Sequence, residues 1–186
     1  MHTDSIRRLQ VALPWIKEWI DELLGSYEES TSVASEIGFT RLATCFPQDV
    51  LDRTRVVTVD RVPFPPVEQY GLPEFEPMQQ IDLDGITFKD TIFLKQGLSS
   101  EALHFHELVH VIQWSRLGVD DFLLAYGLGF LSFGYAQNPL EQMAYALQYN
   151  FELGTLPKEL VRGIERGTDA VWSHVVKIMK GQYGGA

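Results

Sequence analysis

One stretch of the chain combines residue types that bind metal ions with a residue type that moves protons. His106, Glu107 and His110 form the pattern H-E-x-x-H inside an apolar segment that is expected to be helical. Residues four apart lie on the same face of a helix, so the two imidazoles can share one ion. Glu107 can reach a water molecule in an open coordination position, where a carboxylate acts as general base. The motif therefore supplies two metal ligands and a base.

The sequence around the motif predicts the helix that would carry it. Ser99 or Ser100 is expected to be the N-cap of a helix over about 99–117. The alternative interpretation is a buried structural helix whose histidines are satisfied by hydrogen bonds. Two histidines and a glutamate on so apolar a helix need partners that offset their desolvation, and a metal ion serves all three, so we favour the metal site.

A catalytic zinc ion usually takes three protein ligands and leaves a fourth position to water, so a third ligand is needed. Glu141 is the strongest candidate, because Asn138-Pro139 predicts the start of a further helix well after the motif. The alternative role of Glu141 is a capping box with Asn138. His174 is a weaker candidate ligand. His104 lies about 200° of helix rotation from His106, so we expect it behind the ligands or at the surface.

Composition excludes several other classes of site and partner. Cys45 is the only cysteine, which rules out an internal disulfide and a cysteine-based zinc site. The metzincin extension would need glycine at 113 and histidine at 116, where the chain has Gln113 and Arg116. A net charge of -10 argues against a nucleic-acid partner. The apolar runs are too short to span a membrane and no signal-peptide pattern is present, so we expect no membrane partner and a cytoplasmic protein. Signal-independent export stays open.

The distribution of strand-like and helical segments predicts one α+β domain over residues 1–186. We expect an amphipathic N-terminal helical segment over about 4–25, ended by Gly25, and a sheet region over about 55–95. After the motif helix, a helical region is expected over about 119–180. The C-terminal half should therefore be mostly helical.

Within the sheet region, three features are expected. Residues 55–60 and 91–94 are rich in β-branched and apolar residues and predict two strands. Asp84-Gly85 predicts a hairpin turn between short strands on either side of it, and a second turn is expected at Lys89-Asp90, before the strand over 91–94. The proline-rich residues 63–77 predict an irregular connection at the surface.

An H-E-x-x-H helix that follows strands and precedes a helical glutamate resembles the zincin metallopeptidases, and the glutamate makes it similar to the gluzincin branch. The resemblance covers residues of about 80–150. It implies a zincin-like fold in which a small twisted sheet packs on the motif helix. It also implies one zinc ion at His106, His110 and Glu141, with Glu107 activating water to attack a peptide carbonyl. The helix of Glu141 lacks the N-E-x-x-S-D pattern of thermolysin-like enzymes, so the subfamily is not indicated.

The resemblance further implies a peptide or protein substrate. Thr91, Ile92 and Phe93 would belong to an edge strand along which a substrate peptide lies antiparallel. Zincins often stabilise the oxyanion with a tyrosine or histidine beside the metal. Tyr145, one turn after Glu141, and Tyr135, just before that helix, are the candidates for this role, with Tyr126 as a further possibility.

A competing hypothesis is a catalytically inactive zincin-like domain that binds another protein and holds a structural metal ion or none. The two hypotheses differ at the fourth coordination position. An enzyme leaves this position open toward a groove, whereas a structural site fills it with a side chain such as His174. The sequence does not indicate an oligomeric state.

Overall fold

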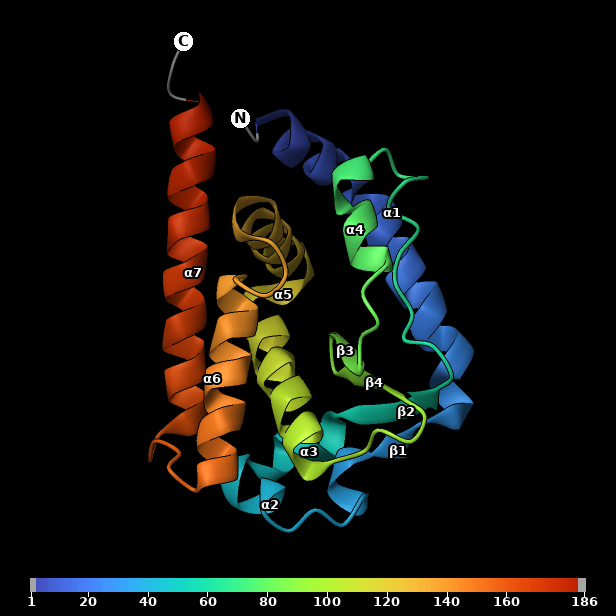
Figure 1. Cartoon of the computed structure of the whole chain (residues 1–186), viewed down its shortest axis with the longest axis vertical. Coiled ribbons are helices and arrows are strands. Elements are labelled where there is room, and N and C mark those ends of the chain that lie inside the picture. The colour runs from blue at the N-terminus through green and yellow to red at the C-terminus, as the bar shows by residue number, and fades with distance from the viewer. Residues whose placement is uncertain (1–2, 184–186) are drawn as a thin grey trace.

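A long N-terminal helix, a small mixed sheet and three long helices build the α+β structure shown in Figure 1. The computed structural model describes residues 3–183. The strands are β1 (Ser32–Val33), β2 (Arg55–Val59), β3 (Gly85–Phe88) and β4 (Thr91–Lys95). The α-helices are α1 (Thr3–Tyr27), α2 (Leu42–Cys45), α3 (Gln48–Arg53), α4 (Glu76–Gln79), α5 (Glu101–Phe133), α6 (Pro139–Leu153) and α7 (Leu160–Tyr183). Short 3-10 helices are η1 (Glu28–Ser30), η2 (Ala34–Glu36) and η3 (Pro73–Phe75).

The predicted N-terminal helix is present, but its predicted end is wrong. Helix α1 continues past Gly25 to Tyr27 and includes Pro14. Gly25 keeps the helical course because no left-handed turn is imposed on it there. The apolar stripe of α1 is buried, with Leu9, Ile16 and Ile20 at most 4% exposed.

The four strands form one sheet in the order β1-β2-β4-β3, with β2 and β4 parallel and the other pairs antiparallel. Strand β4 therefore lies inside the sheet, and the prediction of an edge strand at Thr91, Ile92 and Phe93 is wrong. Side chains on both faces of β4 are apolar and buried, which suits an interior strand. The edge strand beside it is β3.

The hairpin turn predicted at Asp84-Gly85 is wrong, whereas the turn expected at Lys89-Asp90 is present. The strand β3 begins at Gly85, and its turn toward β4 is made by Lys89 and Asp90, with Lys89 in the left-handed region at φ 58°. Asp84 still contributes to the hairpin, because its carbonyl oxygen accepts a hydrogen bond from the Lys95 nitrogen at 2.9 Å. Residues 81–83 form no strand.

Alternating side chains of the sheet enter two apolar clusters. Val57 and Phe93 face α1, where Tyr27 packs edge-on against Phe93 with ring centroids 5.4 Å apart. Val56 and Ile92 face the other way and pack with the first half of α5. The sheet thus lies between α1 and α5, while α6 and α7 cover the opposite side of α5 (Figure 1).

The motif helix begins where predicted. The Ser100 hydroxyl accepts a hydrogen bond from the Leu103 nitrogen at 3.1 Å, which makes Ser100 the N-cap of α5. Gly118 interrupts the helical geometry with φ 75°, so the helices predicted on either side of it are the two halves of one bent element. The start of α6 at Pro139 and a long last helix, α7, also match the expectation.

The connection over residues 63–78 is more deeply buried than predicted. It contains η3 and α4, and Val67, Leu72, Phe75 and Met78 enter the same cluster as α1. The prolines keep the backbone irregular, but the apolar residues between them pack inward.

None of the helices in the described part of the chain combines the length and the apolar character that a membrane span requires.

Candidate metal centre

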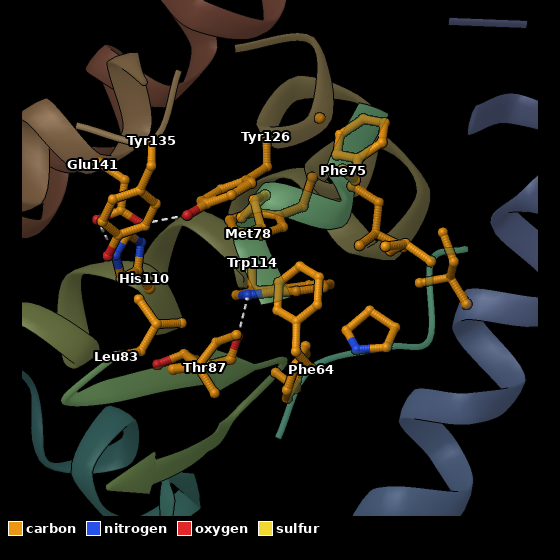
Figure 2. A pocket seen from close by; sticks show the side chains of 18 of the residues that line it. Phe64, Phe75, Met78, Leu83, Thr87, His110, Trp114, Tyr126, Tyr135 and Glu141 are labelled. Carbon is orange, nitrogen blue, oxygen red and sulfur yellow. Dashed lines mark hydrogen bonds and ion pairs between the residues drawn. The ribbon is translucent and has the colours of Figure 1, made fainter. Parts of the chain in front are cut away.

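Helices α5 and α6 bring together the three residues predicted to bind a metal. His106 and His110 lie one turn apart on the first half of α5, and Glu141 lies in the first turn of α6. All three are at most 6% exposed. Figure 2 shows His110 and Glu141 side by side at one end of a pocket. Among the described residues, these three form the only group of potential metal ligands.

The three ligand atoms point at one another. His106 Nε2 lies 3.1 Å from His110 Nε2. Glu141 Oε2 lies 3.4 Å from His106 Nε2 and 3.5 Å from His110 Nε2. Two atoms bound tetrahedrally to zinc at about 2.0–2.1 Å are about 3.3–3.4 Å apart. The cluster therefore has nearly the dimensions that a single zinc ion requires.

Two glutamines orient the imidazoles. His110 Nδ1 lies 2.8 Å from Gln113 Oε1, and His106 Nδ1 lies 3.0 Å from Gln148 Oε1. An amide oxygen only accepts hydrogen bonds, so both Nδ1 atoms donate, and in the neutral rings both Nε2 atoms carry lone pairs. The orientation of the Gln113 amide is set by its nitrogen, which donates to the Leu140 carbonyl at 3.2 Å.

The carboxylate of Glu141 faces the histidines instead of capping its own helix. Its Oε1 accepts a hydrogen bond from the Tyr126 hydroxyl at 2.6 Å, while its buried Oε2 has no hydrogen-bond partner. The helix is capped by Asn138, whose Oδ1 accepts from the Leu140 nitrogen at 3.2 Å. Three electron-pair donors thus meet at one buried point, which calls for a positive charge between them.

The pKa values of His110 and Glu141 agree with the need for a positive charge at this point. Burial disfavours the charged form of His110, but the Glu141 carboxylate outweighs burial and raises the pKa of His110 to about 9. Burial alone would raise the pKa of Glu141, yet His110 and His106 hold it well below its usual range. Without a metal, a proton on His110 supplies the positive charge. The donor set fits a metal ion that takes the place of this proton.

Glu107 lies beside the cluster and is held by the edge strand. Its Oε2 accepts a hydrogen bond from the Thr87 hydroxyl at 2.7 Å. On the other side of the carboxylate, a Cβ at Gly85 would lie 2.7 Å from Glu107 Oε1, so glycine leaves the space that this oxygen occupies. Burial raises the pKa of Glu107, although His106, His110 and Thr87 oppose this.

The three tyrosines considered from the sequence have different surroundings. The Tyr126 hydroxyl donates a hydrogen bond to Glu141. Tyr135 lines the pocket at the end where the metal ligands lie. The Tyr145 ring packs on the His106 ring with centroids 4.5 Å apart and is 44% exposed. The hydroxyls of Tyr135 and Tyr145 lie 3.4 Å apart.

The two other histidines in the described part of the chain lie outside the cluster. His104 is buried and not at the surface, because its ring packs edge-on against Phe39 and its Nδ1 meets the Ser100 carbonyl at 2.9 Å. His174 is exposed on α7. His2 lies outside the described residues.

Sequence reasoning missed the residues that support the ligands. Gln148 lies seven residues after Glu141, two turns further along α6, and Gln113 lies one turn after His110. This helical spacing places both glutamines on the faces that carry the ligands and is a signal that could have identified them. Thr87 had no such signal, since its contact with Glu107 depends on how the sheet packs on α5.

The metal ligands and Glu107 share one pocket with a large apolar lining. Its polar end contains His106, Glu107, His110, Glu141, Tyr126 and Tyr135. The rest is contributed by α1, residues 64–83, β3 and both halves of α5. Figure 2 shows Trp114, Phe64, Phe75 and Met78 extending away from the ligands.

Comparisons of the chain with protein-family models, curated proteins and solved structures give no match. A functional conclusion therefore depends on the chemistry of this pocket.

Proposed function

We propose that the protein is a zinc-dependent hydrolase that cleaves peptide bonds, with zinc held by His106, His110 and Glu141. The observation that carries this proposal is the meeting of three buried electron-pair donors at the spacing of ligands around one ion. Two imidazoles and one carboxylate are a common zinc donor set, and structural zinc sites usually have a fourth protein ligand. The described residues supply three, which favours a catalytic site over a structural one.

A bound zinc ion would supply a positive charge that polarises the substrate carbonyl and makes a neighbouring water molecule more acidic. Glu107 would accept the proton from this water and later deliver it to the leaving amine. Burial raises its pKa above the ordinary value of a glutamate, which makes the carboxylate a stronger proton acceptor. Thr87 would keep the carboxylate oriented during both transfers.

The environment of the site supports a peptide as the substrate. Strand β3 is at the edge of the sheet and lines the pocket with Gly85, Ile86 and Thr87. An extended peptide could therefore add to β3 at the main-chain groups of Gly85 and lie across the metal ligands, because the Thr87 carbonyl already accepts from the Trp114 indole. Of the two tyrosines, Tyr135 would be the better placed to stabilise the oxyanion, because it lines the pocket, whereas Tyr145 packs on His106.

The first prediction tests Glu107. Zinc-loaded protein should cleave members of a quenched-fluorescence peptide library, and Glu107→Gln should keep its zinc but lose activity by about 10²–10⁴-fold, the usual contribution of a general base. Zinc content and cleavage rate are measured on the same samples. Glu152→Gln, an exposed change on α6, is the control and should leave both unchanged. Undiminished turnover by Glu107→Gln would remove Glu107 from this role.

A further inference from the structure

The pocket beside the candidate metal centre has two chemically different parts. At one end are the metal ligands and Glu107. The remainder is lined by apolar side chains that include Phe64, Val67, Leu72 and Phe75, and no charged side chain belongs to this part of the lining. The indole nitrogen of Trp114 is also engaged there, because it donates to the Thr87 carbonyl at 3.0 Å.

This apolar part cannot orient a polar ligand. A polar group that entered it would lose its hydrogen bonds to water and find few partners, which costs free energy. An apolar group would gain by leaving water, by an amount roughly proportional to its area. The occupant must therefore be apolar where it meets Phe64, Phe75 and Met78.

The apolar part of the pocket is suited to bind a portion of the substrate. The same pocket contains His106, Glu107, His110 and Glu141, so a molecule whose reacting carbonyl lies at the metal end has its neighbouring group directed along Trp114 toward Phe64 (Figure 2). Ligand sites in proteins commonly combine such an apolar lining with a few polar groups that fix orientation.

We propose that the substrate carries a large apolar group next to the scissile bond and that this apolar part of the pocket binds it. The inference rests on the proposed function, because it takes the metal end of the pocket as the place of reaction. The group is either an aliphatic acyl chain or the apolar side chain of a peptide. Both share the chemistry that this lining recognises.

A series of hydroxamates tests the inference through binding alone. Each compound has the same zinc-binding head, so only the attached apolar group changes. Calorimetric titration of zinc-loaded protein compares straight-chain hydroxamates from acetohydroxamate to decanohydroxamate with leucine and phenylalanine hydroxamates. We expect affinity to rise about fourfold per added methylene until the pocket is full, as burial of one methylene predicts. A continuous rise with straight chains assigns an acyl chain, whereas a maximum at the amino-acid compounds assigns a side chain.

A variant locates the effect in the pocket. Phe64 is only half-buried, so Phe64→Asp brings a carboxylate into the apolar part with little loss of core packing. It should reduce the ratio of decanohydroxamate to acetohydroxamate affinity by at least tenfold. Phe133→Asp, an exposed change at the end of α5 outside this pocket, is the matched control and should keep the ratio of the unmodified protein.

The two proposals fail in different ways. If acetohydroxamate binds zinc-loaded protein but longer or aromatic compounds bind no tighter, the inference about the apolar group is overturned while the metal site stands. If acetohydroxamate itself does not bind zinc-loaded protein, the open coordination position that the proposed function requires is overturned, and the inference falls with it. Equal affinity ratios for Phe64→Asp and the unmodified protein would also overturn the proposed place of binding.

Discussion

His106 and His110 donate through Nδ1 to glutamine oxygens, so their Nε2 atoms meet Glu141 Oε2 as three electron-pair donors. Such an arrangement is unfavourable unless a proton or a metal ion lies among the three atoms. The support comes from amide oxygens, which add no charge of their own to the site. The charge of a bound divalent ion would then be partly offset by Glu141 alone, which leaves a net positive centre for polarising a carbonyl.

Replacing the third ligand should weaken metal binding without preventing folding. Glu141→Ala removes one of three ligand atoms, whereas Asn138 still caps α6. Because removing only a supporting residue typically costs 10–100-fold in metal affinity, we expect a loss of more than about 100-fold. Competition with a chromophoric chelator measures the zinc dissociation constant, and Glu152→Ala on the same helix is the control. An unchanged constant would show that Glu141 is not a ligand.

The hydroxyl of Tyr126 should act as a positioning group. Tyr126→Phe leaves Glu141 Oε1 without its donor at 2.6 Å and should lower zinc affinity by about 10–100-fold. Tyr149→Phe serves as the control because Tyr149 is 61% exposed on α6. The same chelator competition applies. Equal zinc affinity of Tyr126→Phe and the unmodified protein would mean that Glu141 is held in place without this hydrogen bond.

The ligands could be predicted at the residue scale because helical spacing is a local property. His106 and His110 share a face of α5 whatever the rest of the chain does. The position of Glu141 depends on the packing of two helices, which is not a local property. Its alternative role in a capping box is local, so the sequence could rank the two roles but not decide between them. Thr87 could not be predicted, since its contact with Glu107 joins a strand to a helix.

At the scale of elements, the bent helix α5 connects the sheet with α6 and α7. Gln113 reaches from α5 to the Leu140 carbonyl on α6, and Asn138 donates to the Tyr126 carbonyl on the second half of α5 at 3.0 Å. These contacts fix the position of α6 relative to His106 and His110 on α5. The orientation of Glu141 toward His106 and His110 is therefore a property of the helix pair.

The approach of β3 to α5 should control the position of the general base. A Cβ at residue 85 would lie 2.7 Å from Glu107 Oε1 and 3.0 Å from Leu94 Cδ2, so Gly85→Ala must displace the carboxylate or the strand. We expect zinc affinity to be kept and turnover to fall by about a hundredfold, since a shift of about 1 Å can have this effect. Gly25→Ala, with nothing within 4 Å of the added Cβ, is the control. Normal turnover of Gly85→Ala would show that this spacing is not needed.

The sheet was the part of the fold least accessible to sequence. Asp84-Gly85 is the stronger turn pattern, yet of the two expected turns only Lys89-Asp90 forms a hairpin, because pairing with β4 places Ile86 opposite Phe93. The order of strands depends on the parallel pairing of β2 with β4, which is a contact between distant segments. Because of this pairing, the strand that contains Thr91, Ile92 and Phe93 lies inside the sheet. The edge strand on that side is β3, which contacts Glu107.

At the scale of the molecule, the site lies where two apolar clusters meet. Phe105, Leu108 and Val109 of α5 belong to the cluster that includes Ile92 and Leu94. Trp114 belongs to the cluster on the α1 side. The polar side chains of the motif are therefore surrounded by packed apolar residues, which lowers the local dielectric constant and strengthens electrostatic interactions within the site. The net charge of -10 is a property of the whole chain, and Glu107 and Glu141 are buried exceptions among its acidic residues.

The most direct test of the metal centre is a crystal structure of zinc-loaded protein with anomalous data collected at the zinc absorption edge. We predict one strong peak per chain, about 2.0–2.2 Å from His106 Nε2, His110 Nε2 and Glu141 Oε2, with Glu107 nearby but not bound to the ion. A zinc-loaded protein with no peak at these three atoms, or with its peak elsewhere, would contradict the account.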